Sequence, residues 1–337
     1  MISFPSMLTA ICCIAKCENR YLEEWTNYHL ALGFDHIFIH DNNDISGEQI
    51  ITAVSADERV TVIDCRGKTA YQNTAYTSFY QRYGKEYDWI AYIDVDEFIT
   101  FSKESGIKNI NDFLSRFDSQ VDIVHLNWMC YGDNDIVELD DDYSVLRRFV
   151  QPLPYDKHIQ YDFPENNHVK SIIRGGMDIG NRMITVHTPK DGDYRVFDAE
   201  GRPCKNDYFK PYDFSTAYIR HYVTKTIYEW LMKISKGIAT ANDSSELYPI
   251  DRFFLYNERS SEKEKVIKDY LLFKDAIALS VNTDLAICRE KLQKMEAEYG
   301  HLKKDYYSAI RSKAYRLGKA LTSPARLLRK IKVFFKK

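Results

Sequence analysis

The stretch WIAYIDVDEF (89–98) decides how the rest of the sequence is interpreted. Four of the five residues before Asp94 are bulky and apolar, which predicts a buried strand at Trp89–Ile93. Three carboxylates, Asp94, Asp96 and Glu97, follow it directly. On an extended backbone, residues two apart point to the same side, so Asp94 and Asp96 can address one cation. The stretch therefore predicts an acidic centre at the end of a core strand.

Carboxylate oxygens suit Mg²⁺ or Mn²⁺, which keep coordination positions open for substrate phosphates. A cation that bridges two phosphates neutralises the charge that grows on a leaving diphosphate. The alternative interpretation is an acidic turn after a strand, because a bare Asp-x-Asp occurs by chance in many proteins. The position of Asp94 and Asp96 after a core strand favours the metal site.

Towards the N-terminus, strand and helix patterns alternate. We predict strands at 8–15, 35–40 and 59–64, and helices at 19–32, 47–56 and 70–83. This alternation predicts an α/β protein with a mostly parallel central sheet flanked by helices. Ligands of such sheets bind at the carboxyl ends of the strands, which here are 15–18, 41–44, 64–68 and 94–97.

Towards the C-terminus the pattern is less regular. We predict short strands at 122–128, 145–150, 170–173, 183–187 and 217–222, then a helix at 224–239 and further helices through 248–302. Trp230 lies within the predicted helix at 224–239 and is expected to be a core residue. The predicted organisation is a catalytic domain at 1–245, a helical extension at 246–302 and a tail at 303–337.

The tail has an unusual charge. Residues 303–337 hold twelve Lys or Arg and one acidic residue, Asp305, interspersed with Leu, Ile and Phe. Such a segment fits an anionic membrane surface; a solvated tail and non-specific nucleic-acid contact are the alternatives. Seven scattered cysteines without a CxxC pair favour reduced thiols, and no stretch reaches the length of a membrane span. We therefore expect a cytoplasmic protein, peripheral at the inner face of the membrane, with no nucleic-acid partner.

Five blocks, in order, carry a family resemblance. They are CIAKCENRYLEEWTNYHLALGFDHIFIHDNND (13–44), Gln72 and Tyr76 followed by WIAYIDVDEF (89–98), LNWMCYGDND (126–135), VKSIIRG (169–175) with VHTP (186–189), and IRHYVTKTIYEWLMKISKG (219–237). Over roughly 8–240, the chain resembles bacterial glycosyltransferases of the family-2-like type and their relatives in glycosyltransferase family 92. The resemblance implies a GT-A fold.

The resemblance also implies roles for single residues. Asp94, Asp96 and His221 would be the Mn²⁺ or Mg²⁺ ligands, with His187 as the competitor of His221. The nucleotide-sugar donor would contact residues in the loops after the strands and in the late "HY" block: Ala15, Lys16, Glu18, Asp41, Gln72 and Lys225. For Lys16 a solvated side chain, and for Asp41 a turn cap, are the alternative interpretations.

The relatives are expected to invert the sugar's configuration, with a carboxylate that deprotonates the acceptor hydroxyl. Asp133 and Asp135 are the candidate bases, and Glu138 and Asp178 stay open. Lys170 and Arg174 are either phosphate- or acceptor-binding residues or an exposed strand face. Trp128 is either a sugar platform or a core residue.

The predicted function is transfer of a hexose from a nucleotide-sugar, with UDP the favoured nucleotide, to a glycan or lipid-linked glycan in cell-surface polysaccharide synthesis. One alternative is a metal-dependent nucleotidyltransferase, although residues 15–20 lack the glycine expected of a triphosphate-binding loop. The other is a non-catalytic glycan- or lipid-binding module, which needs neither the paired aspartates nor the late histidine.

Overall fold

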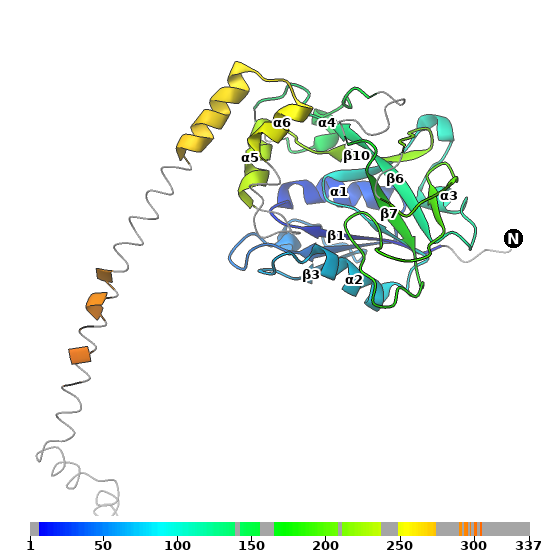
Figure 1. Ribbon diagram of the computed structural model, residues 1–337, viewed down its shortest axis with the longest axis horizontal. Helices are drawn as coiled ribbons and strands as arrows, with labels where there is room; N and C mark the ends of the chain where they lie inside the picture. Colours follow the sequence, from blue (N-terminus) through cyan, green and yellow to red (C-terminus); the bar gives the residue numbers. More distant parts are fainter. Residues whose placement is uncertain are drawn as a thin grey trace, which may run out of the picture. The chain divides into compact units, whose positions relative to one another are not determined.

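The computed structural model describes residues 7–138, 142–155, 165–207, 211–236 and 249–273, and single positions between 290 and 304. The chain divides into two compact units, residues 1–267 and 268–337. All named helices and strands lie in the first unit (Figure 1). In the second unit, the described positions are helical.

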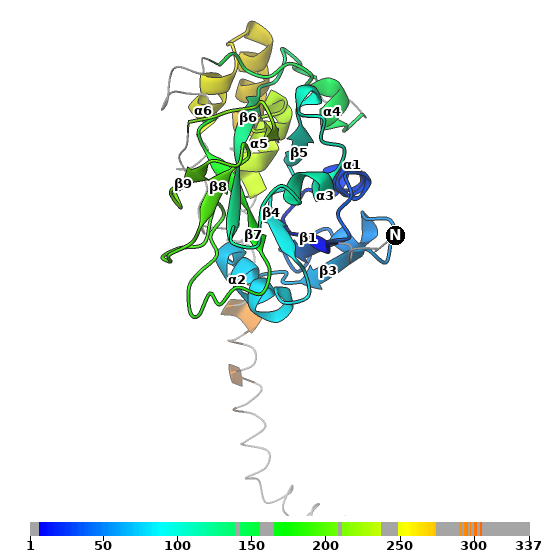
Figure 2. The same ribbon diagram turned by 90° about the vertical axis from the view of Figure 1, so that its right-hand side faces the viewer.

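The first unit is built on a mixed sheet whose main path runs β3-β2-β1-β4-β7-β6-β10-β5 (Figures 1 and 2). The strands on that path are β3 (Val60–Asp64), β2 (His36–Asp41), β1 (Thr9–Ala15), β4 (Trp89–Tyr92), β7 (Val169–Arg174), β6 (Ile123–Tyr131), β10 (Ala217–Tyr222) and β5 (Glu97–Phe101). Two short strands, β8 (Val196–Asp198) and β9 (Pro203–Cys204), extend it beside β6.

The direction of the strands determines what lies at each edge. β1 pairs in parallel with β2 and β4, β2 with β3, and β6 with β10. β7 is antiparallel to both β4 and β6, so β4 and β6 run the same way. The carboxyl ends of six strands therefore share one edge, and the first residues of β7 lie at that edge with them.

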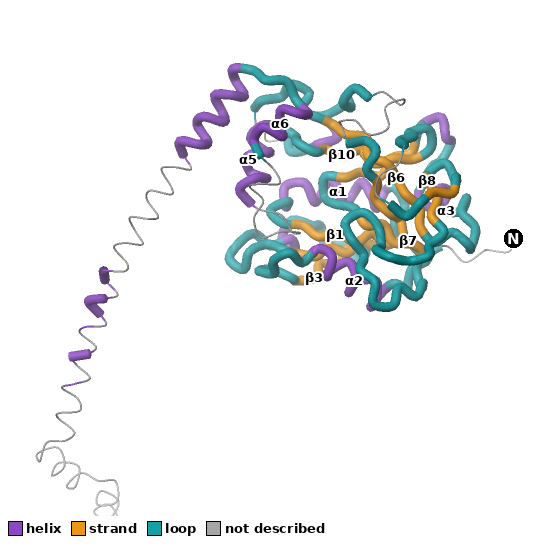
Figure 3. The backbone as a smooth tube through the Cα atoms, viewed as in Figure 1, coloured by secondary structure: helices purple, strands orange, loops and turns teal. Residues whose placement is uncertain are grey.

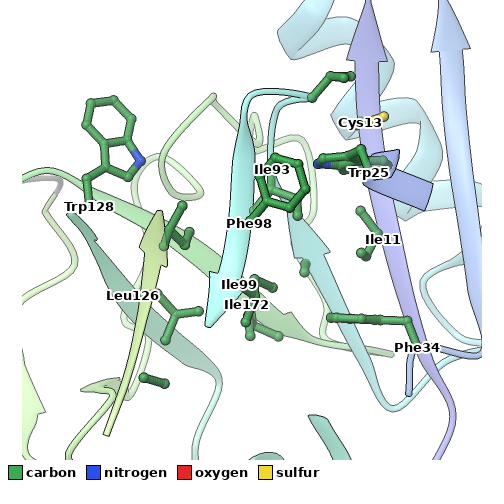
Figure 4. Packing of buried hydrophobic residues seen from close by; sticks show 14 of the residues in the cluster. Ile11, Cys13, Trp25, Phe34, Ile93, Phe98, Ile99, Leu126, Trp128 and Ile172 are labelled. Atoms are coloured by element: carbon green, nitrogen blue, oxygen red, sulfur yellow. The ribbon is translucent and has the colours of Figure 1, made fainter. Parts of the chain in front are cut away.

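Alternation along β1 explains why helices cover both faces of the sheet. Ile11 and Cys13 point to one face and pack in a buried cluster with Trp25 of α1 (Asn19–Ala31), as Figure 4 shows. Ala10 and Cys12 point to the other face and pack with Phe79 of α2 (Gln72–Tyr83). Because successive side chains of a strand alternate, a continuous apolar run requires cover on both sides. β1 is thus buried between α1 on one face of the sheet and α2 on the other (Figure 3).

The remaining helices are shorter. They are α3 (Ile110–Leu114), α4 (Val145–Arg148), α5 (Ile227–Lys236) and α6 (Ile250–Tyr256), with 3₁₀ turns η1 (Ile50–Thr52) and η2 (Lys103–Ser105). α5 begins with a capping box: the Glu229 N–H donates to Thr226 Oγ1 at 3.3 Å, and the Thr226 N–H donates to Glu229 Oε2 at 3.0 Å. The predicted helix at 224–239 is confirmed for 227–236, and residues 237–239 lie outside the described part.

Three predicted elements are wrong. The helix at 47–56 is only η1, because Asp41 Oδ2 accepts the Ile50 N–H at 3.0 Å and holds the segment as a loop. The strand at 145–150 is α4, because the Ser144 hydroxyl caps the Arg147 N–H and Glu24 accepts the Val145 N–H.

The strand at 183–187 is instead a turn. The Thr185 N–H donates to the Thr188 carbonyl at 3.2 Å, and Ile184 forms a single β-bridge with Pro189. Conversely, β5 was not predicted from the sequence. Its first residue, Glu97, lies within the acidic motif, and only pairing with β10 makes 97–101 a strand.

The α/β class with a mixed sheet and flanking helices is confirmed, and the finer GT-A assignment stays a prediction. The domain boundaries at 245 and 302 also stay predictions; α6 belongs to the first compact unit. The basic tail lies outside the described residues except for Lys304. In the part of the chain that is described, no helix combines the length and apolar character needed to cross a bilayer.

Candidate functional site

The candidate site forms where the six parallel strand ends meet. In the register of the sheet, Ala15 lies opposite Asp41, and Asp41 lies opposite Asp64. The stretch Asp94–Glu97 follows β4, and Lys225 follows β10. The topology therefore brings predicted site residues from distant parts of the sequence to one edge.

Asp94 is held by three side chains. Its Oδ2 lies 2.6 Å from the Nζ of Lys170, and its Oδ1 accepts hydrogen bonds from Gln72 Nε2 at 3.0 Å and Tyr76 OH at 3.3 Å. Its side chain is 34% exposed. The observed contact of Gln72 is this hydrogen bond to Asp94, and its predicted contact with the donor stays a prediction.

Lys170 is the buried cation of the acidic motif. Its side chain is 1% exposed and its Nζ also lies 3.4 Å from Glu97 Oε2, so the predicted alternative of an exposed strand face is wrong for Lys170. Burial lowers the pKa of Lys170, but the Asp94 and Glu97 carboxylates outweigh that effect and raise it. Burial raises the pKa of Glu97 well above its ordinary value. Lys170 reaches this position because β7 runs against its neighbours.

Asp96 faces a different set of partners. Its Oδ2 lies 3.1 Å from Lys233 Nζ and 3.9 Å from Lys225 Nζ, and its Oδ1 lies 3.8 Å from His221 Nε2. Burial raises the pKa of Asp96, but these basic groups outweigh burial and lower it below its ordinary value. Asp94 and Asp96 are thus neutralised by different lysines.

His221 packs against Trp128, with ring centroids 4.2 Å apart, and its Nδ1 has no hydrogen-bond partner among the described residues. Burial lowers the pKa of His221 to about 3, so the imidazole is neutral at pH 7. The competitor His187 makes a different polar contact: its Nδ1 lies 2.8 Å from the Val169 carbonyl oxygen. Its ring packs on Trp128 as well, and Trp128 is 8% exposed, which favours the core interpretation of that residue.

A pocket of about 370 Å³ adjoins Asp96. Its lining comes from the loops after β1 and β2, from α1 and from the segment 224–235: Cys17, Glu18, Arg20, Tyr21, Glu48, Thr224, Lys225, Glu229, Met232, Lys233 and Ser235. The volume falls within the range of small-molecule sites. Glu18, predicted to contact the nucleoside, and Lys225, predicted to contact a phosphate, thus line the same pocket.

Two residues of this lining have an unusual backbone. Cys17 has φ 54° and Lys225 has φ 55°, both in the left-handed region although neither is glycine. Each such conformation costs roughly 1–3 kcal/mol and is found preferentially at functional sites. The Cys17 N–H donates to Asn43 Oδ1 at 2.7 Å, and Lys225 Nζ lies 4.7 Å from the centre of the Tyr21 ring. These contacts tie the Cys17 segment to the loop after β2 and Lys225 to α1.

One wall of the pocket is a buried ionic network. Glu229 accepts from Tyr21 OH at 2.6 Å and pairs with Arg148 at 2.8 Å. Burial raises the pKa of Glu229, but hydrogen bonds from Arg148 outweigh burial and lower it to about 2. The network ties α1, α4 and α5 together around the pocket.

Other predicted donor residues have contacts of their own. Asp41 is 3% exposed and accepts from Asn43 and Ile50, so its observed contacts are those of a turn cap. Lys16 forms an ion pair of 3.0 Å with Asp44 near the surface. Ala15 is buried at the end of β1. A role for these three residues in donor binding stays a prediction.

The candidate bases lie after β6. Asp133 pairs with Lys263 at 2.6 Å, and its N–H donates to Asn257, whose Nδ2 donates to Thr224 of the pocket lining at 3.1 Å. Burial raises the pKa of Asp133, the direction that favours a general base. Asp135 is largely exposed and lies 3.6 Å from Lys263.

The other predicted residues lie apart from these contacts. Asp178 caps its own turn by accepting the Gly180 N–H, and Glu138 is exposed. Arg174 donates to the backbone carbonyls of Val121 and Asp118 and stacks over Trp89. These contacts are structural.

The fit to a divalent cation is partial. Across the described positions, no three His, Cys, Asp or Glu side chains converge into a ready-made metal site. Asp96 and His221, however, present a carboxylate oxygen and an imidazole nitrogen side by side. Mg²⁺-type ions commonly use one or two protein ligands and complete their shell with substrate phosphates and water. The residues therefore fit a cation that arrives with a diphosphate.

Lys233 carries no individual prediction from sequence, although it stands in the block at 219–237. The signal that points to it is the spacing Glu229-x-x-x-Lys233, which places both residues on one face of α5. Spacing alone does not reveal that this face lines a pocket beside Asp96.

No family model matches the chain. Over 123 residues, it is 25% identical to a glycosyltransferase family 92 protein from rice, Oryza sativa subsp. japonica; the match covers 36% of this chain and 20% of the rice protein. Among solved structures, HddC from Yersinia pseudotuberculosis is 14% identical, with 50% of this chain and 74% of that chain covered and a TM-score of 0.24, too low to support a shared fold. The similarity to the rice protein supports a relationship to glycosyltransferases over about a third of the chain.

Proposed function

We propose that this chain is a glycosyltransferase that binds a nucleotide-sugar donor in the pocket beside Asp96. The observation that carries the proposal is the composition of that pocket, in which Glu18 of the β1 loop and two lysines, Lys225 and Lys233, face the same space. In a nucleoside diphosphate the nucleoside is uncharged and the diphosphate is anionic. The loop after β1 offers a surface for the nucleoside, and the two ammonium groups offer positive charge for the diphosphate. The similarity to the rice family-92 protein supports the same reading.

Each residue has a role in this proposal. Lys225 and Lys233 contact donor phosphates and balance their charge. Asp96 and His221 hold a Mn²⁺ or Mg²⁺ ion, and Asp94 is kept in position by Lys170, Gln72 and Tyr76. When bound, the cation supplies Lewis-acid stabilisation of the departing diphosphate.

Asp133 is the proposed base that takes the proton of the acceptor hydroxyl, which gives an inverting reaction. UDP is the favoured nucleotide, the transferred group a hexose, and the acceptor a glycan or lipid-linked glycan of the cell surface. The basic segment 303–337 would place the enzyme at the anionic inner face of the membrane.

The test is a panel of UDP- and GDP-sugars incubated with the full chain and Mn²⁺, with nucleotide release as the readout. We expect release from at least one UDP-sugar, and a loss of at least about 100-fold in Asp96→Asn. Lys85→Met, which removes an exposed positive charge after α2, is the matched control and should retain the wild-type rate.

Thermal stability separates the rival functions. UDP with Mn²⁺ at about 100 times its Kd should stabilise the fold by about 2.7 kcal/mol, and Asp96→Ala should abolish the shift. Stabilisation by a nucleoside triphosphate with Mg²⁺ but not by UDP would favour a nucleotidyltransferase. No thermal shift with either ligand, together with no nucleotide release from any nucleotide-sugar, would favour a non-catalytic binding module.

A further inference from the structure

Asp96 lies behind the two lysines of the pocket. Lys225 and Lys233 line the pocket, and the lining does not include Asp96, whose Oδ2 contacts both ammonium groups. A cation beside His221 would bind Oδ1 and would compete with the two lysines for the single negative charge of Asp96. The lysines likewise cannot give their full charge to a phosphate while Asp96 holds them.

The two lysines differ in their freedom to move. The Lys225 side chain is 6% exposed, packs over the Tyr21 ring and starts from a left-handed backbone. The Lys233 side chain is 19% exposed and lies on a helix that lines the pocket. Its four-carbon stem allows the ammonium group to turn from Asp96 towards a ligand. Lys233 is thus the residue that can change partner.

Lys233 should change partner only when the cation and the diphosphate bind together, because only then do the charges stay balanced. A divalent cation at Asp96 without an anion would crowd positive charge against two lysines in a buried place. A diphosphate without the cation would draw Lys233 away and leave the buried Asp96 carboxylate next to an anion, with only the more distant Lys225 as a cationic partner. When both arrive, the cation balances the charge of Asp96 and Lys233 turns to the phosphates.

We propose that Lys233 is a donor-phosphate ligand that pairs with Asp96 while the pocket is empty, and that a divalent cation bound at Asp96 releases it. Cation and nucleotide then bind cooperatively, and each binds only weakly without the other. This proposal rests on the proposed donor pocket. It assigns Lys233 a role in addition to its hydrogen bond to the Val223 carbonyl oxygen at 3.1 Å.

The test measures two affinities separately on the full chain. Mn²⁺ binding without nucleotide is followed by the electron paramagnetic resonance signal of free Mn²⁺, and UDP binding is followed by calorimetry in Mn²⁺ or in EDTA. We expect the wild type to bind UDP at least about tenfold more tightly in Mn²⁺ than in EDTA.

Lys233→Met should move the two affinities in opposite directions. Mn²⁺ alone should bind about threefold more tightly, because Asp96 loses a competing cation, and UDP in Mn²⁺ should bind about tenfold more weakly, because a phosphate loses its partner. Asp96→Asn should bind UDP in EDTA about threefold more tightly than the wild type and should lose the effect of Mn²⁺. Lys85→Met should match the wild type in every measurement.

A purely structural role for Lys233 predicts that both affinities fall together in Lys233→Met, and that outcome overturns the exchange. Unchanged affinities in this variant, with the wild type still binding UDP and Mn²⁺ cooperatively, also overturn it while the proposed function stands. If the wild type binds no nucleotide under either condition, both proposals fail.

Discussion

The ammonium group of Lys170 lies 2.6 Å from the Oδ2 of Asp94, and the lysine side chain is 1% exposed. A buried lysine is costly unless it is paired, and here its partners are the first and last carboxylates of the acidic motif, Asp94 and Glu97. The motif is therefore not only a set of candidate metal ligands. The fold itself pairs one of its carboxylates with a buried lysine.

Removal of Lys170 should therefore destabilise the protein. In Lys170→Met, Glu97 and Asp94 are left close together without their cation. We expect a loss of about 3 kcal/mol in the free energy of unfolding, the lower end of the range for a broken buried pair, because Asp94 is 34% exposed. Urea denaturation measures the loss, and Arg59→Gln, which breaks a surface pair with Asp57, should have a much smaller effect. Equal effects of the two substitutions would contradict this account.

Two adjacent glycines should respond differently to alanine. A Cβ at Gly175 would lie 1.7 Å from the Tyr87 carbonyl oxygen and 2.5 Å from that of Gly84, so backbone would have to move. We expect Gly175→Ala to cost at least about 3 kcal/mol. Gly176 has φ +73° but open space around it, so Gly176→Ala should cost only about 1–2 kcal/mol. Thermal unfolding of both variants checks the order, and the reverse order would refute the explanation.

Acid should weaken the fold through His29. Its Nδ1 lies 2.9 Å from the Trp25 carbonyl oxygen, and its Nε2 accepts the Ile99 N–H at 3.3 Å, which links α1 to β5. Burial lowers the pKa of His29 from 6.5 to about 3. Between these values the unfolded chain binds the proton and the folded chain does not, so stability falls as the pH falls from 6.5 towards 3.

For this one histidine, the loss between pH 7 and pH 5 should be about 2 kcal/mol. His187 and His221, whose pKa values burial also lowers to about 3, act in the same direction. Urea titrations at several pH values should therefore show a smaller pH dependence in His29→Gln than in the wild type. An identical pH dependence would mean that His29 is not the group that takes up the proton.

Asp133→Asn should separate a catalytic role from a binding role. If Asp133 is the base, kcat for sugar transfer falls by about 10²–10⁴-fold while UDP still binds with Mn²⁺. Asp135→Asn, two residues away and exposed, is the matched comparison and should change kcat by less than about tenfold. A larger effect of Asp135→Asn would move the role of base to that residue.

The regular half of the fold could be predicted from the sequence because local signals there agree. The apolar run of β1, the amphipathic α1 with Gly33 at its end (φ +103°) and the run before Asp94 each have one consistent structural reading. The segments at 47–56 and 145–150 were different, because contacts from Asp41 and Glu24 determined their structure. Asp41 and Glu24 both lie outside the segments that they contact, so the hydrophobic periodicity of those segments does not reveal them.

By itself, the sequence determined which residue types stand at the strand ends, and hence that acidic and basic side chains would gather at one edge of an α/β sheet. Only the tertiary structure decided how they pair. The reversed direction of β7 delivers Lys170 to Asp94, and α5 folds back so that Lys233 reaches Asp96, 137 residues away in the chain. Ion pairs between distant segments depend on strand direction and helix packing, and no local pattern of residues encodes either.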